Sequence, residues 1–473
     1  MQHVSPRYLL PPFITVPPSA ADYTPNGKPM SCDVGEEFPK NKSTEDDGII
    51  KIAIHEQSDE VETASKASSE HSGPEEDYKI DTLFYRICYF CFILGVNFYK
   101  SRCQKLRFVS MIIVSLNCLI NVYFIGYVVF LTMTKPFEAE RVATSISMCT
   151  WVLQATLSTL FLAHWQATSQ GCNILKQLYV AHKGVGIHYH RRSLQAIVRT
   201  FYVVLALIVI YSVAMAVANF LDYDVGYLDR DIPKIFGDRR LFIIVQLANL
   251  YCILCWGVAL FIFSLLIHSA HYEFVYYNEQ VRSVSCLFSI CTKDSLIKCE
   301  YAYQSDEMLC NYLLKLMKIH NRLTECVKRL DLMFHRYAFV MIATIIPTTI
   351  FSLFMVFHKP ADSFCIEFLF SFPLVCFCVF SFIALVNAPS KLHDTIYNTK
   401  SALCANTHIW FPYRPNVYHS ALAFVCHLDQ TNLGVSIWGF AVVTKQLVLT
   451  TLSVMVTCLA LFLQVGDCSA ANR

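Results

Sequence analysis

Seven long apolar stretches constrain the fold of this chain more than any other feature of its sequence. A helix that crosses a bilayer needs about 20 mostly apolar residues. Seven segments meet this need with few or no charges in their interiors: 108–134, 142–165, 196–221, 241–268, 337–357, 366–388 and 446–465. The sequence therefore predicts an all-α polytopic membrane protein with seven transmembrane helices.

The composition excludes several classes of protein. The chain of 473 residues is 55% hydrophobic and only 16% charged, against about 25% charged in soluble domains. A net charge of +2 argues against a nucleic-acid-binding protein, which normally has a basic face. The sequence has no phosphate-binding loop, nucleophile elbow or carboxylate pair in a shared apolar site. We therefore expect no enzymatic activity and no cofactor.

The first 78 residues differ from the rest of the chain. They combine repeated prolines with clusters of Ser, Glu and Asp, a composition that cannot bury enough apolar surface to order itself. We interpret 1–78 as a disordered cytoplasmic tail. The apolar run 87–98 is short for a span and is predicted to lie at the membrane surface. The alternative is that it crosses, which gives eight spans and changes the orientation. Cys88 and Cys91 within it have no second ligand pair for zinc, so helix packing is the expected role and no metal is predicted.

The orientation follows from the basic residues of the loops. Thirteen Lys and Arg residues lie in the loops on one side of the predicted membrane and eight on the other, and the richer side is normally cytoplasmic. This bias predicts a cytoplasmic N-terminus. The membrane-surface helix and spans one to four are expected in 79–268, and cytoplasmic anchor helices in 269–336. Spans five and six are expected in 337–388, followed by a cytoplasmic segment in 389–445. Span seven is expected in 446–465, and a short extracellular tail in 466–473.

A regular apolar stripe precedes the fifth span. Eight residues follow one another at alternating intervals of four and three: Leu309, Leu313, Leu316, His320, Leu323, Val327, Leu330 and Phe334. This spacing is typical of one face of a helix that packs along its whole length. Two partners are open: other cytoplasmic helices of the same chain, or a second subunit in an assembly below the membrane. His320 lies within the stripe, where a core histidine is expected rather than a metal ligand.

Polar residues follow one face of the last span. Thr450, Thr457 and Gln464 are seven residues apart, or two helical turns. An amide in an apolar helix is costly to bury unless it is hydrogen-bonded or faces water. The stripe therefore predicts either a hydrogen bond between helices or the lining of a water-filled path.

The end of the chain resembles a known family. Gustatory receptors of arthropods, and gustatory-receptor-like proteins of other invertebrates, end their last span with Thr-Tyr, five apolar residues and Gln-Phe. This sequence has Thr457 and Gln464 at that spacing, with Cys458 in place of the Tyr and Val465 in place of the Phe. The pair Gly439-Phe440 resembles the approach to that helix. The likeness covers about residues 80–468 and indicates a divergent member of the insect chemoreceptor superfamily.

The resemblance implies a mechanism. Members of the superfamily are tetrameric, ligand-gated, non-selective cation channels whose last span lines a central pore. Carried over, this implies a taste-like chemosensory channel, homomeric or heteromeric, in the plasma membrane of a sensory or neuronal cell. The pore-lining candidates are Thr450, Thr457, Leu461, Gln464 and Val465, of which Leu461 and Val465 can close the pore by dewetting.

A small-molecule pocket is expected in the outer half of the bundle. Such pockets are mostly apolar and aromatic with a few polar groups. The candidates with these properties are Tyr127, Trp151, Gln154, Asn219, Gln246, Tyr251 and Glu367. The alternative for each is a structural role, as an interfacial aromatic or a hydrogen bond between helices.

A second class of function is also open. The chain can be a sensor of a chemical, of light or of peroxide that conducts no ions and signals through a partner such as a G protein. A current recorded from a cell without that partner distinguishes a channel from such a sensor.

Overall fold

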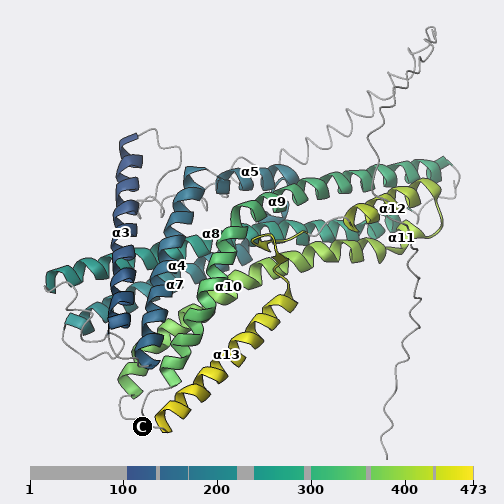
Figure 1. Ribbon diagram of the computed structural model, residues 1–473. Helices are drawn as coiled ribbons and strands as arrows, with labels where there is room; N and C mark the ends of the chain where they lie inside the picture. The colour runs from purple at the N-terminus through teal and green to yellow at the C-terminus, as the bar shows by residue number, and fades with distance from the viewer. Residues whose placement is uncertain are drawn as a thin grey trace, which may run out of the picture. The chain divides into compact units, whose positions relative to one another are not determined.

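The computed structural model describes residues 104–134, 139–168, 170–220, 239–291, 300–357, 364–429 and 433–471. The predicted tail 1–78 and the short run 87–98 lie outside these residues. The described chain is helical apart from one two-stranded hairpin (Figure 1). Its elements are α3 Gln104–Thr134, α4 Ala139–Ala167, α5 Gln170–His182, α6 Val185–Tyr189, α7 Arg191–Phe220, α8 Arg239–Cys291, α9 Glu300–Phe357, α10 Phe364–Cys404, α11 Thr407–Trp410, α12 Pro415–Asp429, β1 Ser436–Ile437, β2 Ala441–Val442 and α13 Lys445–Ala471.

Seven of the helices are long and apolar enough to span a membrane, which confirms the predicted fold class. These are α3, α4, α7, α8, α9, α10 and α13. The helices exceed the predicted spans, because α8 has 53 residues and α9 has 58. The stripe-bearing segment before residue 337 continues without a break into the fifth span, as predicted. The last helix ends at Ala471, so most of the predicted tail 466–473 is helical.

Within the apolar bundle, α4 is the central helix and packs against α3, α8 and α9. Polar side chains support this packing. Asn121 on α3 donates its amide proton to Thr156 on α4 at 2.9 Å. Thr348 on α9 donates to Thr150 on α4 at 2.8 Å. Hydrogen bonds of this kind hold helices together in lipid, where apolar side chains gain little from mutual contact.

The stripe of α9 forms the core of the second half of the molecule, in which α9 packs against α8, α10 and α12. All eight of its side chains are buried. His320 contacts the rings of Phe274, Tyr277 and Phe424, which confirms its expected role as a core histidine. The interpretation in which the stripe packs within one chain is therefore the one that the structure supports. These eight residues expose little surface for a second subunit.

A short hairpin connects this core to α13. Trp438 and Gly439 form its turn, both with positive φ angles of 52° and 79°. The carboxylate of Asp331 on α9 accepts hydrogen bonds from the backbone N–H and the hydroxyl of Ser436, at 2.6 and 2.8 Å. The ring of Trp438 meets Phe339 edge to face at 5.0 Å. The start of α13 is thus fixed to α9.

The connection from α5 through α6 to α7 is fixed to α8 by a buried carboxylate. Glu273, which is fully buried, accepts hydrogen bonds from Nδ1 of His182 at 2.8 Å and from the backbone N–H of Ile187 at 3.0 Å. Gly186 lies directly on the backbone of Tyr272. A Cβ atom at position 186 would stand 2.5 Å from the carbonyl oxygen of Tyr272. Only glycine allows α6 to approach α8 this closely.

Gly186→Ala is expected to destabilise the protein by about 1–3 kcal/mol, because the new methyl group must displace backbone atoms of α8. Gly126→Ala on α3 is the matched control, since nothing lies within 4 Å of its added Cβ. Thermal unfolding of the two purified variants in one detergent measures the difference. Equal melting temperatures would contradict the close contact between α6 and α8.

Candidate functional site

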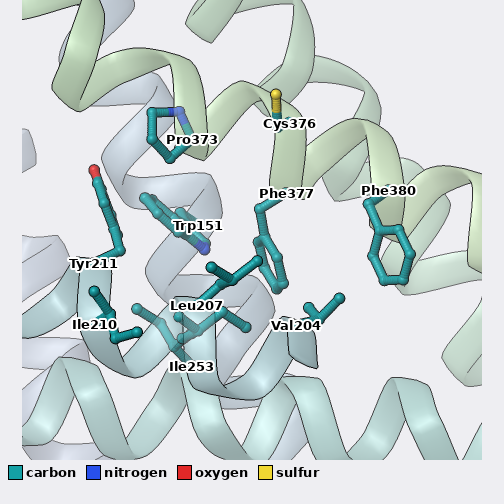
Figure 2. A pocket seen from close by; sticks show the side chains of 11 residues that line it. Trp151, Val204, Leu207, Ile210, Tyr211, Ile253, Pro373, Cys376, Phe377 and Phe380 are labelled. Atoms are coloured by element: carbon teal, nitrogen blue, oxygen red, sulfur yellow. The ribbon is translucent and has the colours of Figure 1, made fainter. Parts of the chain in front are cut away.

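A cavity of about 480 Å³ lies between four helices of the bundle. Its walls come from α4, α7, α8 and α10, and Figure 2 shows their side chains around the space. The lining residues are Trp151, Val204, Leu207, Ile208, Ile210, Tyr211, Ile253, Pro373, Cys376, Phe377 and Phe380. This volume lies within the range of small-molecule pockets.

The lining is apolar and aromatic, and it contains no charged residue. A second layer of aromatic rings supports it. Trp256, which is fully buried, meets Trp151 edge to face at 6.4 Å and Phe377 at 4.6 Å. Because both neighbours of Trp256 line the cavity, this indole fixes their orientation. The cavity is therefore suited to uncharged molecules that bind by contact and displacement of water.

The structure brings one of the seven predicted ligand residues, Trp151, to the cavity wall. Gln154 lies one turn further along α4 and is completely buried. Within the described part of the chain, no group hydrogen-bonds either atom of its amide. Tyr127 on α3 and Tyr251 on α8 do not line the cavity. Asn219, Gln246 and Glu367 belong to α7, α8 and α10, but their side chains lie outside the description. Ligand contact by these residues stays a prediction.

Most of the lining was missed at the sequence level because it is aliphatic. The residues from α7 are ordinary members of an apolar span, which nothing in a single sequence distinguishes from lipid-facing neighbours. On α10 a signal existed. Pro373, Cys376, Phe377 and Phe380 have the spacing of one helical face, and a proline inside a span marks a locally irregular helix.

The last helix, α13, has one packed face and one uncovered face. Met455, Leu459 and Leu463 pack toward α9 and α10, and Phe462 contacts Phe351 at 5.2 Å. Four of the predicted pore residues are exposed in the single chain: Thr450, Thr457, Leu461 and Gln464. Val465 follows them on the helix, and its side chain lies outside the description. Only 6% of the apolar window of α13 is buried, which leaves most of the helix for lipid, water or a neighbouring subunit.

The pocket and α13 meet on the same helix. Phe377 of α10 lines the cavity, and the next residue, Cys378, is fully buried against Phe354 and Met355 of α9. Leu459 and Leu463 of α13 pack on that same cluster. Two adjacent residues of one helix thus face the pocket and the contact with α13.

An ion pair makes a second link between α10 and α13. Nζ of Lys445, at the start of α13, lies 2.6 Å from the carboxylate of Asp394 on α10. Figure 1 shows α13 beside α10 and α9. In the described ranges, no group of three or more His, Cys, Asp or Glu residues is arranged to hold a metal ion.

A family model described as the 7tm chemosensory receptor matches residues 84–467. The chain belongs to the chemosensory receptor family. It is a multi-pass membrane receptor. The search of curated proteins gave no match.

The fold is similar to that of solved olfactory receptors. The insect olfactory receptor OR5 from Machilis hrabei, solved in complex with eugenol and also without it, superposes in both structures with a TM-score of 0.63. The identity is 10%, and the match covers 82% of this chain and 99% of the olfactory receptor. At this identity the likeness concerns the fold alone.

Val204→Trp is expected to fill part of the cavity and to abolish ligand binding without unfolding the receptor. The neighbouring Val203→Trp is the control, because residue 203 is 58% exposed on the outer face of α7. A panel of uncharged odorants and tastants is screened by thermal unfolding of the purified wild type, since a bound ligand raises the melting temperature. Compounds that stabilise the wild type should stabilise Val203→Trp and not Val204→Trp. Equal stabilisation of both variants would exclude this cavity as the ligand site.

Proposed function

We propose that this receptor is a gustatory-type, ligand-gated, non-selective cation channel that assembles as a tetramer around its last helices. The observation that carries the proposal is the uncovered stripe of α13. Thr450, Val454, Thr457, Leu461 and Gln464 are exposed and follow one another at intervals of four, three, four and three. A stripe with this spacing faces one direction along the helix.

The chemistry of the stripe suits a pore better than lipid. Lipid offers no hydrogen-bonding partner for the amide of Gln464, which is therefore more stable against water or another polar group. Thr457 bonds its hydroxyl to the carbonyl of Ser453 at 2.9 Å, which leaves the hydroxyl oxygen able to accept from water. Leu461 and Val465, the neighbours of Gln464, supply the apolar constriction that closes the pore by dewetting.

The ligand is proposed to be a small uncharged molecule in the cavity beside Trp151. An uncharged lining does not compensate the loss of hydration of an ion, so ionic stimuli are disfavoured there. Eugenol in the complex of the structurally similar olfactory receptor supports a small-molecule ligand for this fold. A ligand opens the pore only if it binds the open form more tightly than the closed form.

The route of gating runs through α10. A ligand that moves Phe377 also moves Cys378, and with it the cluster against which Leu459 and Leu463 of α13 pack. Close-packed side chains transmit displacements of this kind, because an interior has little free volume to absorb them. Lys445 and Asp394 connect the same two helices near the start of α13.

Assembly is proposed to use surfaces other than the buried stripe of α9. The hairpin before α13 exposes two large apolar side chains, Trp438 at 48% and Phe440 at 84%. They lie next to the helix that would surround the axis, and Asp331 fixes their position. The cytoplasmic N-terminus, the plasma membrane and the sensory or neuronal cell type belong to the same proposal.

The decisive experiment is electrical recording from cells that express this chain alone and lack the relevant G proteins. A ligand-gated cation current is expected with a compound that stabilises the purified protein. Gln464→Phe should reduce the unitary conductance or change the permeability ratio of cations at unchanged surface expression. Val456→Phe, on another exposed face of α13, is the control and should leave conduction unchanged. Ligand binding without any current would instead support the sensor that signals through a partner.

The link between α10 and α13 has its own test. Asp394→Lys or Lys445→Asp alone should shift the half-activating ligand concentration by about fivefold, since each places like charges together. The double exchange should restore the wild-type value. Stability should change by less than about 1 kcal/mol, because both partners are partly exposed to solvent. Identical dose–response curves for all variants would rule out this ion pair as part of the gating route.

A further inference from the structure

The turn between α5 and α7 carries a concentrated positive charge. From Arg141 to Leu221 the sequence contains no Asp or Glu. Lys183, Arg191, Arg192 and Arg199 are exposed, and Tyr189 is 68% exposed among them. Within the described residues, no carboxylate forms an ion pair with any of these four cations. We call Lys183, Tyr189, Arg191 and Arg192 the basic turn.

The basic turn is a built structure rather than a loose loop. The buried carboxylate of Glu273 holds it at Ile187 and at His182, and Gly186 rests on the backbone of Tyr272. The ring of His190 stacks on that of Tyr272, with 4.8 Å between centroids and 20° between planes. The carboxylate of Glu273 accepts hydrogen bonds from His182 and Ile187 and forms no ion pair with the exposed cations of the turn in the described residues. The backbone that carries the exposed cations is therefore held in one arrangement on α8.

The apolar face that continues from the turn shows which anion fits. Arg191 and Arg192 begin α7, whose outer surface then exposes Val203, Val213 and Val217, each more than half exposed. Such a face in a membrane receptor contacts acyl chains. Arg199 lies two turns beyond Arg192, or about 10 Å along the helix. The headgroup region of a bilayer is also several ångströms deep. Where the apolar face of α7 meets acyl chains, the side chains of these cations can therefore reach lipid phosphates.

We propose that the basic turn binds the headgroup of an anionic phospholipid, with a polyphosphorylated inositol lipid as the preferred class. Arg191 and Arg192 supply planar guanidinium groups that bind phosphate oxygens through paired N–H donors. Lys183 adds a point charge, and Tyr189 lies at the interface as aromatic residues do in membrane proteins. The lipid thereby holds the first turn of α7, the helix that also forms one wall of the ligand pocket.

The test uses the full-length chain in an uncharged detergent and does not depend on channel activity. The probe is dioctanoyl phosphatidylinositol 4,5-bisphosphate, and binding is measured by titration and by the rise in melting temperature. Replacing three cations, Lys183→Gln with Arg191→Gln and Arg192→Gln, should weaken binding on the order of a hundredfold, at roughly fivefold per charge. Binding should also weaken as salt is raised.

The matched control removes three exposed cations elsewhere, with Lys315→Gln, Lys318→Gln and Arg322→Gln on α9. It should bind within about twofold of wild type. A charge-preserving variant, Lys183→Arg with Arg191→Lys and Arg192→Lys, keeps the charge and loses the paired donors of the two guanidinium groups. It should bind more weakly than wild type but clearly more tightly than the triple Gln variant, which separates lost charge from lost folding. Dioctanoyl phosphatidylcholine should bind weakly.

Three results would overturn the proposal. The first is an equal loss of affinity in the α9 control, which would mean that general positive charge attracts the probe. The second is binding of free inositol 1,4,5-trisphosphate as tightly as the lipid, which would assign the turn to a soluble phosphate. The third is no saturable binding to the wild type.

Discussion

The burial of one helical stripe, from Leu309 to Phe334 of α9, is the interaction on which the rest of the architecture depends. The stripe gives the chain an apolar core where α8, α9, α10 and α12 meet. Because α9 then continues without interruption through the apolar bundle, this core and the bundle share one continuous helix. The same helix holds the hairpin through Asp331, and so fixes where α13 begins. One sustained pattern of apolar residues thereby sets the positions of the pocket helices and of the last span together.

The sequence was sufficient to predict the elements that depend only on properties along the chain, such as length and hydropathy. Length and hydropathy define a membrane helix, so all seven spans were predicted, as was the continuous helix from Leu309 into the fifth span. The C-terminal end of α8 was not predicted, because the helix continues beyond the apolar span and packs there on other helices rather than on lipid. The choice between packing within a chain and packing between chains was also open in the sequence. A heptad stripe specifies that a partner face exists and not which chain supplies it.

Most residues that line the pocket could not be predicted from the sequence, for a different reason. Sequence reasoning favours polar and aromatic residues as ligand contacts, and among its candidates only Trp151 is seen to line the cavity in the part of the chain that the structure describes. Val204 and Leu207 are neither polar nor aromatic. In a single sequence, an aliphatic residue of a membrane helix that faces a cavity cannot be distinguished from one that faces acyl chains. Only the packing of four helices separates the two cases. The neighbours Val203 and Val204 illustrate this, because one is exposed to the outside and the other lines the cavity.

The narrow attachment of α13 has an evolutionary consequence. This helix contacts its own chain along one strip around Met455, Leu459 and Phe462, and it shares no residue with the cavity lining. Mutations on its free side therefore leave the pocket intact, and mutations in the pocket leave that side unaltered. For the channel proposed above, stimulus preference and permeation can therefore change separately in descendants of such a gene.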